Sequence, residues 1–145
     1  MILFENGIIK LDYFPATDIL EVAYPDLYDF MLPEVLNSID ILVGNIVNFD
    51  VKRVLLDSSL TVVAVSEEKS RRITAHLAAG LMRTRLQKLA RVQSASAVVE
   101  ATAQGNIRHV RDTYALPFVL QNFTSKPEAV DWLKESSQTE AALKR

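Results

Sequence analysis

The sequence contains no cysteine and only four glycines among its 145 residues. The lack of cysteine excludes disulfides, zinc–thiolate sites and cysteine nucleophiles. Neither a phosphate-binding glycine loop nor a Gly-x-Ser-x-Gly nucleophile elbow is present. The two histidines, His76 and His109, stand in no spacing that is typical of a metal site. We therefore expect a non-enzymatic protein that has no catalytic residues and no metal or other cofactor.

Long apolar runs and a secretory signal are also missing. No stretch approaches the roughly 18 apolar residues of a membrane span, and residues 41–49 form one of the longest runs. The first five residues lack the basic region of a signal peptide. With 49% apolar and 23% charged residues, the composition is that of a globular domain. We expect a cytoplasmic protein without a transmembrane segment.

Charge is unevenly distributed along the chain. Residues 1–65 carry ten acidic and three basic side chains, whereas residues 66–145 carry 8 acidic and 13 basic ones. Between residues 69 and 111, nine lysines or arginines accompany a single acid, Glu100. This asymmetry indicates either a partner surface or two halves whose fields cancel in the fold. A pI near 5.7 and the lack of aromatic residues from 50 to 113 argue against a nucleic-acid partner.

Strand and helix patterns alternate along the sequence. Residues 8–13 and 19–24 predict two strands that pair as an antiparallel hairpin through the turn at residues 14–18. Asn6-Gly7 predicts a type I′ turn, which adds a short strand at residues 2–5. Further strands are predicted at residues 53–57, 87–93 and 118–122. Helices are predicted to begin at Pro33, Ser66, Ala95 and Ser125.

This order defines an expected fold class and domain organisation. After the opening β-hairpin each strand is followed by a helix, and strand–helix–strand crossovers make parallel neighbours. We expect a single α/β domain over residues 1–136, with a mixed, mostly parallel five-stranded sheet and four helices. Residues 137–145 are expected to form a polar C-terminal tail.

Three segments in this order carry a resemblance to a known family. They are Val54-Leu55-Leu56-Asp57, Ala90-Arg91-Val92 and Phe123-Thr124-Ser125-Lys126-Pro127-Glu128-Ala129-Val130-Asp131-Trp132-Leu133. From about residue 7 to 134 the chain resembles the STAS-like family, whose founding members are bacterial anti-sigma-factor antagonists. It is most similar to the uncharacterised bacterial branch that is grouped with CRAL-TRIO lipid-carrier domains. The resemblance implies a regulatory protein–protein interaction module or, as the alternative, a small carrier of lipid or other apolar ligands.

The resemblance also implies a candidate phospho-switch. In the sigma-regulating members, a kinase phosphorylates a serine in an Asp-Ser-Ser-Gly loop before the second helix. Asp57, Ser58 and Ser59 match this loop, although Leu60 replaces the glycine. If Asp57 instead corresponds to an earlier aspartate of the family, the phosphorylated position lies near Ser66. The other interpretation of Asp57 is a structural acid that is bonded to nearby backbone amides.

Two surfaces are candidates for protein contacts. Lys69, Arg72, His76 and Arg83 fall on one side of the second predicted helix, at the edge of its apolar stripe. They predict either a solvated face or a docking surface for an acidic or phosphorylated partner. Residues 24–32 are unusually apolar for a connection, which makes them a candidate for contact between two copies in a homodimer. The early aromatic residues otherwise fill the core or line a site for an apolar ligand.

Overall fold

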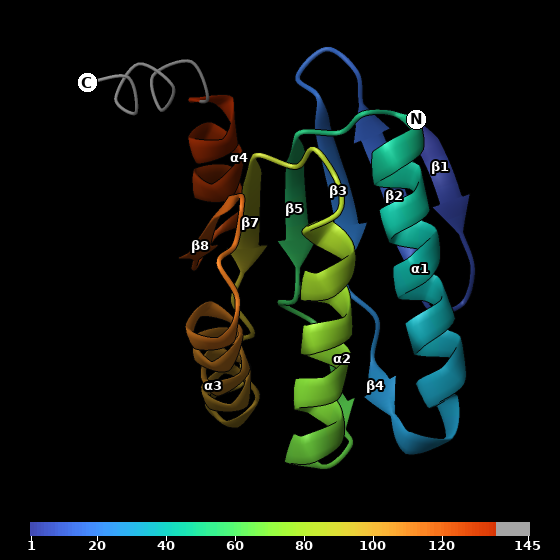
Figure 1. Cartoon of the computed structure of the whole chain (residues 1–145), viewed down its shortest axis with the longest axis vertical. Coiled ribbons are helices and arrows are strands. Elements are labelled where there is room, and N and C mark those ends of the chain that lie inside the picture. The colour runs from blue at the N-terminus through green and yellow to red at the C-terminus, as the bar shows by residue number, and fades with distance from the viewer. Residues whose placement is uncertain (136–145) are drawn as a thin grey trace.

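The computed structural model describes residues 1–135, so the expected tail at 137–145 and residue 136 lie outside the described residues. Six strands form one mixed sheet in the order β1-β2-β3-β5-β7-β8 (Figure 1). Its strands are β1 (Ile2–Glu5), β2 (Lys10–Phe14), β3 (Ile19–Ala23), β5 (Arg53–Asp57), β7 (Lys88–Val92) and β8 (Val119–Phe123). The first three strands are antiparallel neighbours, and β3, β5, β7 and β8 run parallel.

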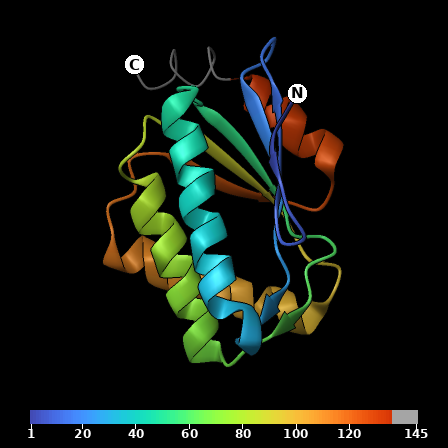
Figure 2. The ribbon, with the colours of Figure 1, turned by 90° about the vertical axis from the view of Figure 1, so that its right-hand side faces the viewer.

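Helices cover both faces of this sheet. They are α1 (Leu32–Asn48), α2 (Glu67–Leu81), α3 (Ala97–Thr113) and α4 (Lys126–Lys134). Helices α1 and α2 pack on one face and α4 on the other, as the edge-on view shows (Figure 2). The predicted α/β class, the mostly parallel sheet, the four helices and the opening hairpin are confirmed. The short strand predicted at residues 2–5 is confirmed as β1, and because it joins the same sheet, the sheet has six strands where five were expected.

Each central strand contributes to two separate cores, because successive side chains of a strand point to opposite faces. In β5, Val54 and Leu56 pack against α1 and α2, whereas Leu55 packs against Ala129 and Leu133 of α4. All three β5 side chains are buried. This two-sided burial explains why the strand is a short, continuous apolar run in the sequence.

Serine side chains begin three of the helices. Ser66 Oγ accepts a hydrogen bond from Lys69 N at 3.2 Å, and Ser96 Oγ accepts one from Val99 N at 3.3 Å. Ser125 Oγ accepts from the N3 amide in the same way, at 3.3 Å. Such caps satisfy backbone amides that have no partner inside the helix. The predicted starts of α2 and α4 are therefore confirmed to within one residue.

Lys88 fastens α4 to the sheet. Its side chain is 2% exposed, and its Nζ donates a hydrogen bond of 2.6 Å to the main-chain oxygen of Trp132. The ammonium also lies 4.4 Å from the centre of the Trp132 ring. Burial lowers the pKa of Lys88 from its ordinary value. Because the last carbonyls of a helix lack partners within it, a cation at this position both pairs with one of them and opposes the helix dipole.

Two features of the fold differ from the sequence analysis. Leu27–Tyr28 (β4) and Val63–Ala64 (β6) form a small second, parallel sheet, and Asp29–Met31 forms a 3₁₀ helix, η1. Segments of two or three residues carry no detectable periodicity.

The type I′ turn predicted at Asn6-Gly7 is wrong, because no glycine among the described residues has a positive φ. Instead, the Asn6 side-chain oxygen accepts hydrogen bonds from the backbone amides of Ile8 and Ile9.

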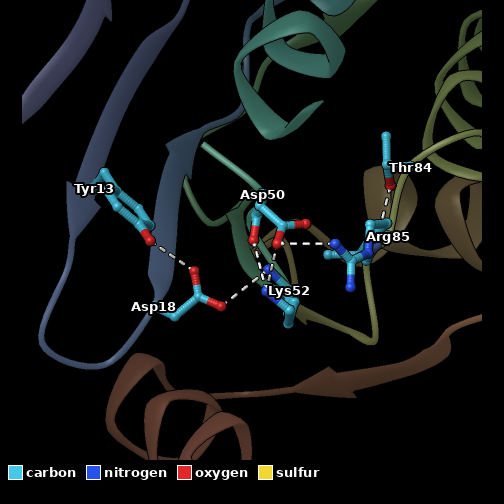
Figure 3. Close-up of polar contacts among 7 residues, drawn as sticks. Tyr13, Asp18, Asp50, Lys52, Thr84 and Arg85 are labelled. Atoms are coloured by element: carbon cyan, nitrogen blue, oxygen red, sulfur yellow. Dashed lines mark hydrogen bonds and ion pairs between the residues drawn. The ribbon is translucent and has the colours of Figure 1, made fainter. Parts of the chain in front are cut away.

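A polar cluster holds the amino ends of the central strands together (Figure 3). The Tyr13 hydroxyl donates to Asp18 Oδ1 at 2.7 Å, and Asp18 Oδ2 accepts from the amide of Lys52 at 3.1 Å. Asp50 Oδ2 accepts from Lys52 Nζ at 3.0 Å and from Arg85 Nη1 at 3.2 Å. Burial, together with the Asp18 hydrogen bond, raises the pKa of Tyr13 to about 12. These side chains satisfy one another, so the cluster links the hairpin turn to the loop before β5.

Residues Asp29–Asn48, which form η1 and α1, are long and apolar enough to cross a membrane by length and composition alone. One such helix is weak evidence, because a helix that packs in a protein's own core passes the same test. Val35, Ile39, Leu42 and Ile46 of α1 are buried in the larger core. The residues described here therefore include no clear transmembrane segment.

The close approach of α1 and α2 depends on Gly80. A Cβ atom at this position would lie 2.7 Å from Val43 Cγ2, so the two helices would have to separate or Val43 would have to rotate. We predict that Gly80→Ala lowers the free energy of unfolding by about 1–3 kcal/mol, although alanine is the better helix former by about 1 kcal/mol. Urea unfolding measures this change.

The matched control is Gly44→Ala, because a Cβ atom there meets nothing within 4 Å. It should stabilise the protein by about 0.5–1 kcal/mol. Adding Val43→Ala to Gly80→Ala should recover much of the lost stability. Equal effects of the two glycine substitutions would contradict the proposed clash.

Candidate functional site

A cavity of about 100 Å³ lies between α2, α3 and the sheet. Its wall is mainly apolar. Its apolar side chains include Leu56, Leu77, Leu89, Ile107, Phe118 and Leu120. An apolar cavity of about 150 Å³ stays dry and binds benzene. This cavity is smaller but is not fully enclosed, so its lining suits a small hydrocarbon group that extends toward its opening.

The cavity exists because the inward face of α3 lacks close partners on the sheet. Ile107 and Val110 of α3 are buried, yet they belong to neither of the two cores. Together with Val99 and Ala103, which lie on the same side of the helix, they line the cavity. The apolar stripe of α3 is thus shielded from water but faces space that is not filled by strand side chains.

A buried ion pair attaches the start of α3 to the sheet. Arg91 Nη1 and Nη2 of β7 donate to the two carboxylate oxygens of Glu100 at 2.8 and 2.9 Å. The side chains are 9% and 16% exposed. Glu100 also accepts from Ser94 N at 2.8 Å and from the Gln104 side chain, and Arg91 donates to Asn122 Oδ1 at 3.2 Å. Burial alone raises the pKa of Glu100, but these hydrogen bonds outweigh it, so the pKa lies below its ordinary value.

A second polar contact joins α3 to α2. Asn106 Nδ2 donates to Ser70 Oγ at 2.9 Å, and both residues are buried. Thr74 Oγ1 donates to the main-chain oxygen of Ser70 at 3.1 Å. All three residues line the cavity, but each already takes part in one of these hydrogen bonds. This contact and the ion pair hold α3 over the cavity from two directions.

The polar end of the cavity lies at the carboxyl edge of the parallel strands, where α/β folds place their ligands. Tyr24 directly follows β3 and Ser58 directly follows β5. Because Leu56 pairs with Arg91, and because side chains alternate along a strand, Ser58, Tyr24 and Arg91 all point toward the α2 and α3 face. All three line the cavity.

Tyr24 and Ser58 supply hydroxyl groups that no other described residue engages. Ser58 is 6% exposed, and its Oγ has no hydrogen-bond partner within residues 1–135. The Tyr24 hydroxyl likewise has none in this part of the chain. Burial raises the pKa of Tyr24 to about 12, although the nearby Arg91 charge opposes the shift. Tyr24 and Thr61 also separate the cavity from a second hollow of about 370 Å³, which Asp57 and Ser59 line.

The predicted phospho-switch residues lie in different environments. Asp57 Oδ1 accepts from Ser59 N at 3.0 Å and from Ser59 Oγ at 2.6 Å, which supports its interpretation as a structural acid. Ser58 is buried beside the cavity. Ser66 is exposed at the start of α2, where its Oγ caps the helix. Ser66 is the most exposed of the three serines, Ser59 is partly exposed, and a phospho-switch at either position stays a prediction.

The predicted docking surface on α2 is partly neutralised by α1 and η1. Lys69 Nζ lies 3.1 Å from Asp29 Oδ1, and His76 Nε2 lies 2.8 Å from Asp40 Oδ1. Arg72 and Arg83 are exposed. The acidic first half and the basic second half of the chain thus meet at this surface, which was one of the two expected outcomes of the charge asymmetry.

The candidate self-association segment at residues 24–32 is only partly buried. Leu27 is buried, whereas Phe30 is 78% exposed and stacks on Tyr28 with ring centres 5.6 Å apart. Because the Phe30 ring is exposed, it is available for contact with a second copy, and the homodimer stays a prediction. Residues 1–135 contain no group of three or more histidine, aspartate or glutamate side chains that could hold a metal ion.

Sequence analysis missed Tyr24, Arg91 and Glu100 as parts of one site. A signal was present for two of them: Arg91 is a charged residue between two apolar residues of a predicted strand, and Glu100 is the single acid in a long basic stretch. A buried arginine needs a partner, and the one nearby acid was the natural candidate. Tyr24 offered no comparable signal, because a tyrosine at a strand end is an ordinary residue.

No family model, curated protein or solved structure matches this chain. Its class is therefore defined by the fold and the site: an α/β protein with a mostly parallel sheet and an apolar cavity beneath α3.

The ion pair makes stability depend on pH. Because the pKa of Glu100 is lowered in the folded protein, the pair stabilises it fully above the ordinary value of 4.5, and this contribution is lost as pH falls through the lowered pKa. We predict that Glu100→Gln costs about 3–5 kcal/mol at pH 7, since it leaves Arg91 buried without its anion. The difference from wild type should shrink at acid pH. Urea unfolding across pH measures it.

Asp112→Asn, which removes an exposed carboxylate from the same helix, is the matched control. It should change stability by less than about 0.5 kcal/mol at either pH. Parallel pH profiles for wild type and Glu100→Gln would show that the pair does not contribute in this way.

Proposed function

We propose that the protein is a non-enzymatic binder of a small apolar ligand, which occupies the cavity between α2, α3 and the sheet. The observation that carries this proposal is the cavity itself. It is lined mainly by carbon, lies at the ligand-binding edge of a parallel sheet, and is covered by a helix whose buried side chains lack close partners. The carrier alternative that the family resemblance implies is of the same kind.

A ligand in the cavity would also stabilise the packing of α3, the helix that covers it. Few strand side chains meet α3, and its main polar links to the sheet and to α2 are the Arg91–Glu100 pair and the Asn106–Ser70 hydrogen bond. A ligand that fills the cavity would supply the missing apolar contacts. It would stabilise the folded state by about 2.7 kcal/mol at a free concentration of 100 times Kd.

A cavity-filling substitution tests this proposal. Ala103 lines the cavity from α3, and Ala103→Leu adds three carbon atoms to its wall. We predict that p-xylene raises the Tm of the wild type and leaves the Tm of Ala103→Leu unchanged. The variant itself should be as stable as the wild type or more stable by about 0.5–2 kcal/mol.

Ala101→Leu is the matched control, because Ala101 lies on the exposed side of the same helix and outside the cavity wall. It should keep the full response to p-xylene. A wild type that does not respond, or two leucine variants that respond equally, would exclude the cavity as the binding site.

The protein-interaction module is the second candidate, and the observation that favours it is the exposure of Ser66, Arg72 and Arg83. Ser66 caps α2 and Arg72 lies on it, whereas Arg83 lies beyond its end and not on the helix as predicted. The support for this candidate is weaker, since Lys69 and His76 already face acidic partners within the chain.

Charge reversal tests this second candidate. The double variant Arg72→Glu/Arg83→Glu should reduce recovery of a partner from native lysate without lowering the Tm, and more strongly at low salt. Arg71→Glu/Arg108→Glu makes the same charge change at other exposed positions and should leave recovery intact. Equal recovery with both double variants would remove the docking surface.

A further inference from the structure

Three polar side chains of the cavity lie together at one end, apart from those that α2 and α3 contribute to the wall. Tyr24, Ser58 and Arg91 lie at the carboxyl edge of the sheet, whereas Leu81, Leu116 and Phe118 line other parts of the wall. Such a division fits a ligand that has an apolar body and a single polar group. A pure hydrocarbon would leave the hydroxyls at this end without partners.

Ser58 gives the strongest evidence that a ligand group belongs there. Its side chain is 6% exposed, lines the cavity and has no hydrogen-bond partner among the described residues. Among the described residues, Ser38 Oγ is the one fully enclosed polar side-chain atom without a partner, so the unpartnered Ser58 Oγ is accessible from the cavity. The neighbouring main-chain groups do not explain the position, since Ser58 N donates to Val92 O and Ser58 O accepts from Thr61 N. The hydroxyl is therefore available to a ligand.

Tyr24 supplies a second donor at the same end. Its hydroxyl has no partner in the described part of the chain. A tyrosine hydroxyl is protonated at neutral pH even at its ordinary pKa, so it can donate a hydrogen bond here. Two hydroxyls together suit an oxygen that accepts hydrogen bonds.

The charge balance of this end determines which oxygen group fits. Arg91 is the single cation that lines the cavity within residues 1–135, and both of its Nη atoms already bind Glu100. Because that pair is neutral, a carboxylate or phosphate head would add a buried anion with no cation of its own. An uncharged head avoids this penalty.

We infer that the cavity takes a neutral amphiphile, with a small hydrocarbon body and one hydroxyl or carbonyl group that Tyr24 and Ser58 bind. This inference rests on the proposed function and names the chemical class of its ligand. Three para-substituted toluenes separate the two ideas: p-xylene, p-cresol and p-toluate, which end in a methyl, a hydroxyl and a carboxylate group.

The experiment measures the Kd of each probe at pH 7 by NMR titration, for the wild type and for Ser58→Ala and Tyr24→Phe. Each variant should weaken p-cresol binding about two- to tenfold, the effect of one hydrogen bond, and leave p-xylene binding unchanged. We expect p-toluate to bind wild type at least about a hundredfold more weakly than p-cresol.

Two control variants remove the same groups elsewhere. Ser38→Ala deletes a buried hydroxyl that also lacks a partner but lies outside the cavity wall, on α1. Tyr114→Phe deletes a hydroxyl just after α3, also outside the wall. Neither should change the ratio of the p-cresol and p-xylene Kd values.

The outcomes are distinguishable. If neither p-xylene nor p-cresol binds, the proposed function fails. If both bind and their Kd ratio is unchanged in Ser58→Ala and Tyr24→Phe, the inferred head-group site is wrong while the apolar cavity stands. Binding of p-toluate as tight as that of p-cresol would overturn the requirement for a neutral ligand.

Discussion

The buried ion pair between Arg91 and Glu100 is the contact on which the candidate site depends. It joins the central strand β7 to the start of α3, and it places that helix over the sheet without close apolar packing beneath it. A buried pair contributes little net stability compared with apolar packing, but loss of one partner is costly. The pair therefore fixes the position of α3 even though the space below the helix stays partly unfilled. It also neutralises the one cation that lines the cavity within the described residues, so it sets the charge that a ligand can carry.

The two faces of the sheet serve different purposes. Leu55, Ala90 and Leu133 pack tightly with α4 on one face, where Lys88 binds the end of that helix. On the other face, α1 and α2 form the larger core, and their close approach at Gly80 leaves no room for a side chain. The polar cluster around Asp18 and Asp50 then holds the amino edge of the strands (Figure 3). The apolar unfilled space lies beneath α3, whereas the second hollow lies on the other side of Tyr24 and Thr61, beside Asp57 and Ser59.

Much of the fold was predictable from the sequence, because its signals are local. Ser66 and Ser125 precede apolar helical patterns, and Val54-Leu55-Leu56 shows the continuous apolar run of a strand that is buried on both faces. The site was far less predictable. Leu56, Leu89 and Ile107 have the pattern of ordinary core residues, and a sequence does not record the distance between two apolar surfaces. Ser58 was predicted as a phospho-switch residue because it lies between Asp57 and Ser59 in the chain. Its position beside Tyr24 and Arg91 follows from the pairing of β3, β5 and β7, which no local pattern determines.

The central claim is that a ligand occupies the space beneath α3, and its location in a complex tests this most directly. A crystal structure with p-cresol should show the ring between Leu56, Leu89 and Ile107, with its hydroxyl within hydrogen-bond distance of Ser58 and Tyr24. The Arg91–Glu100 pair should remain closed, because the ligand carries no charge that competes for it. A ligand bound elsewhere on the protein, or an empty cavity at a saturating concentration, would contradict the account.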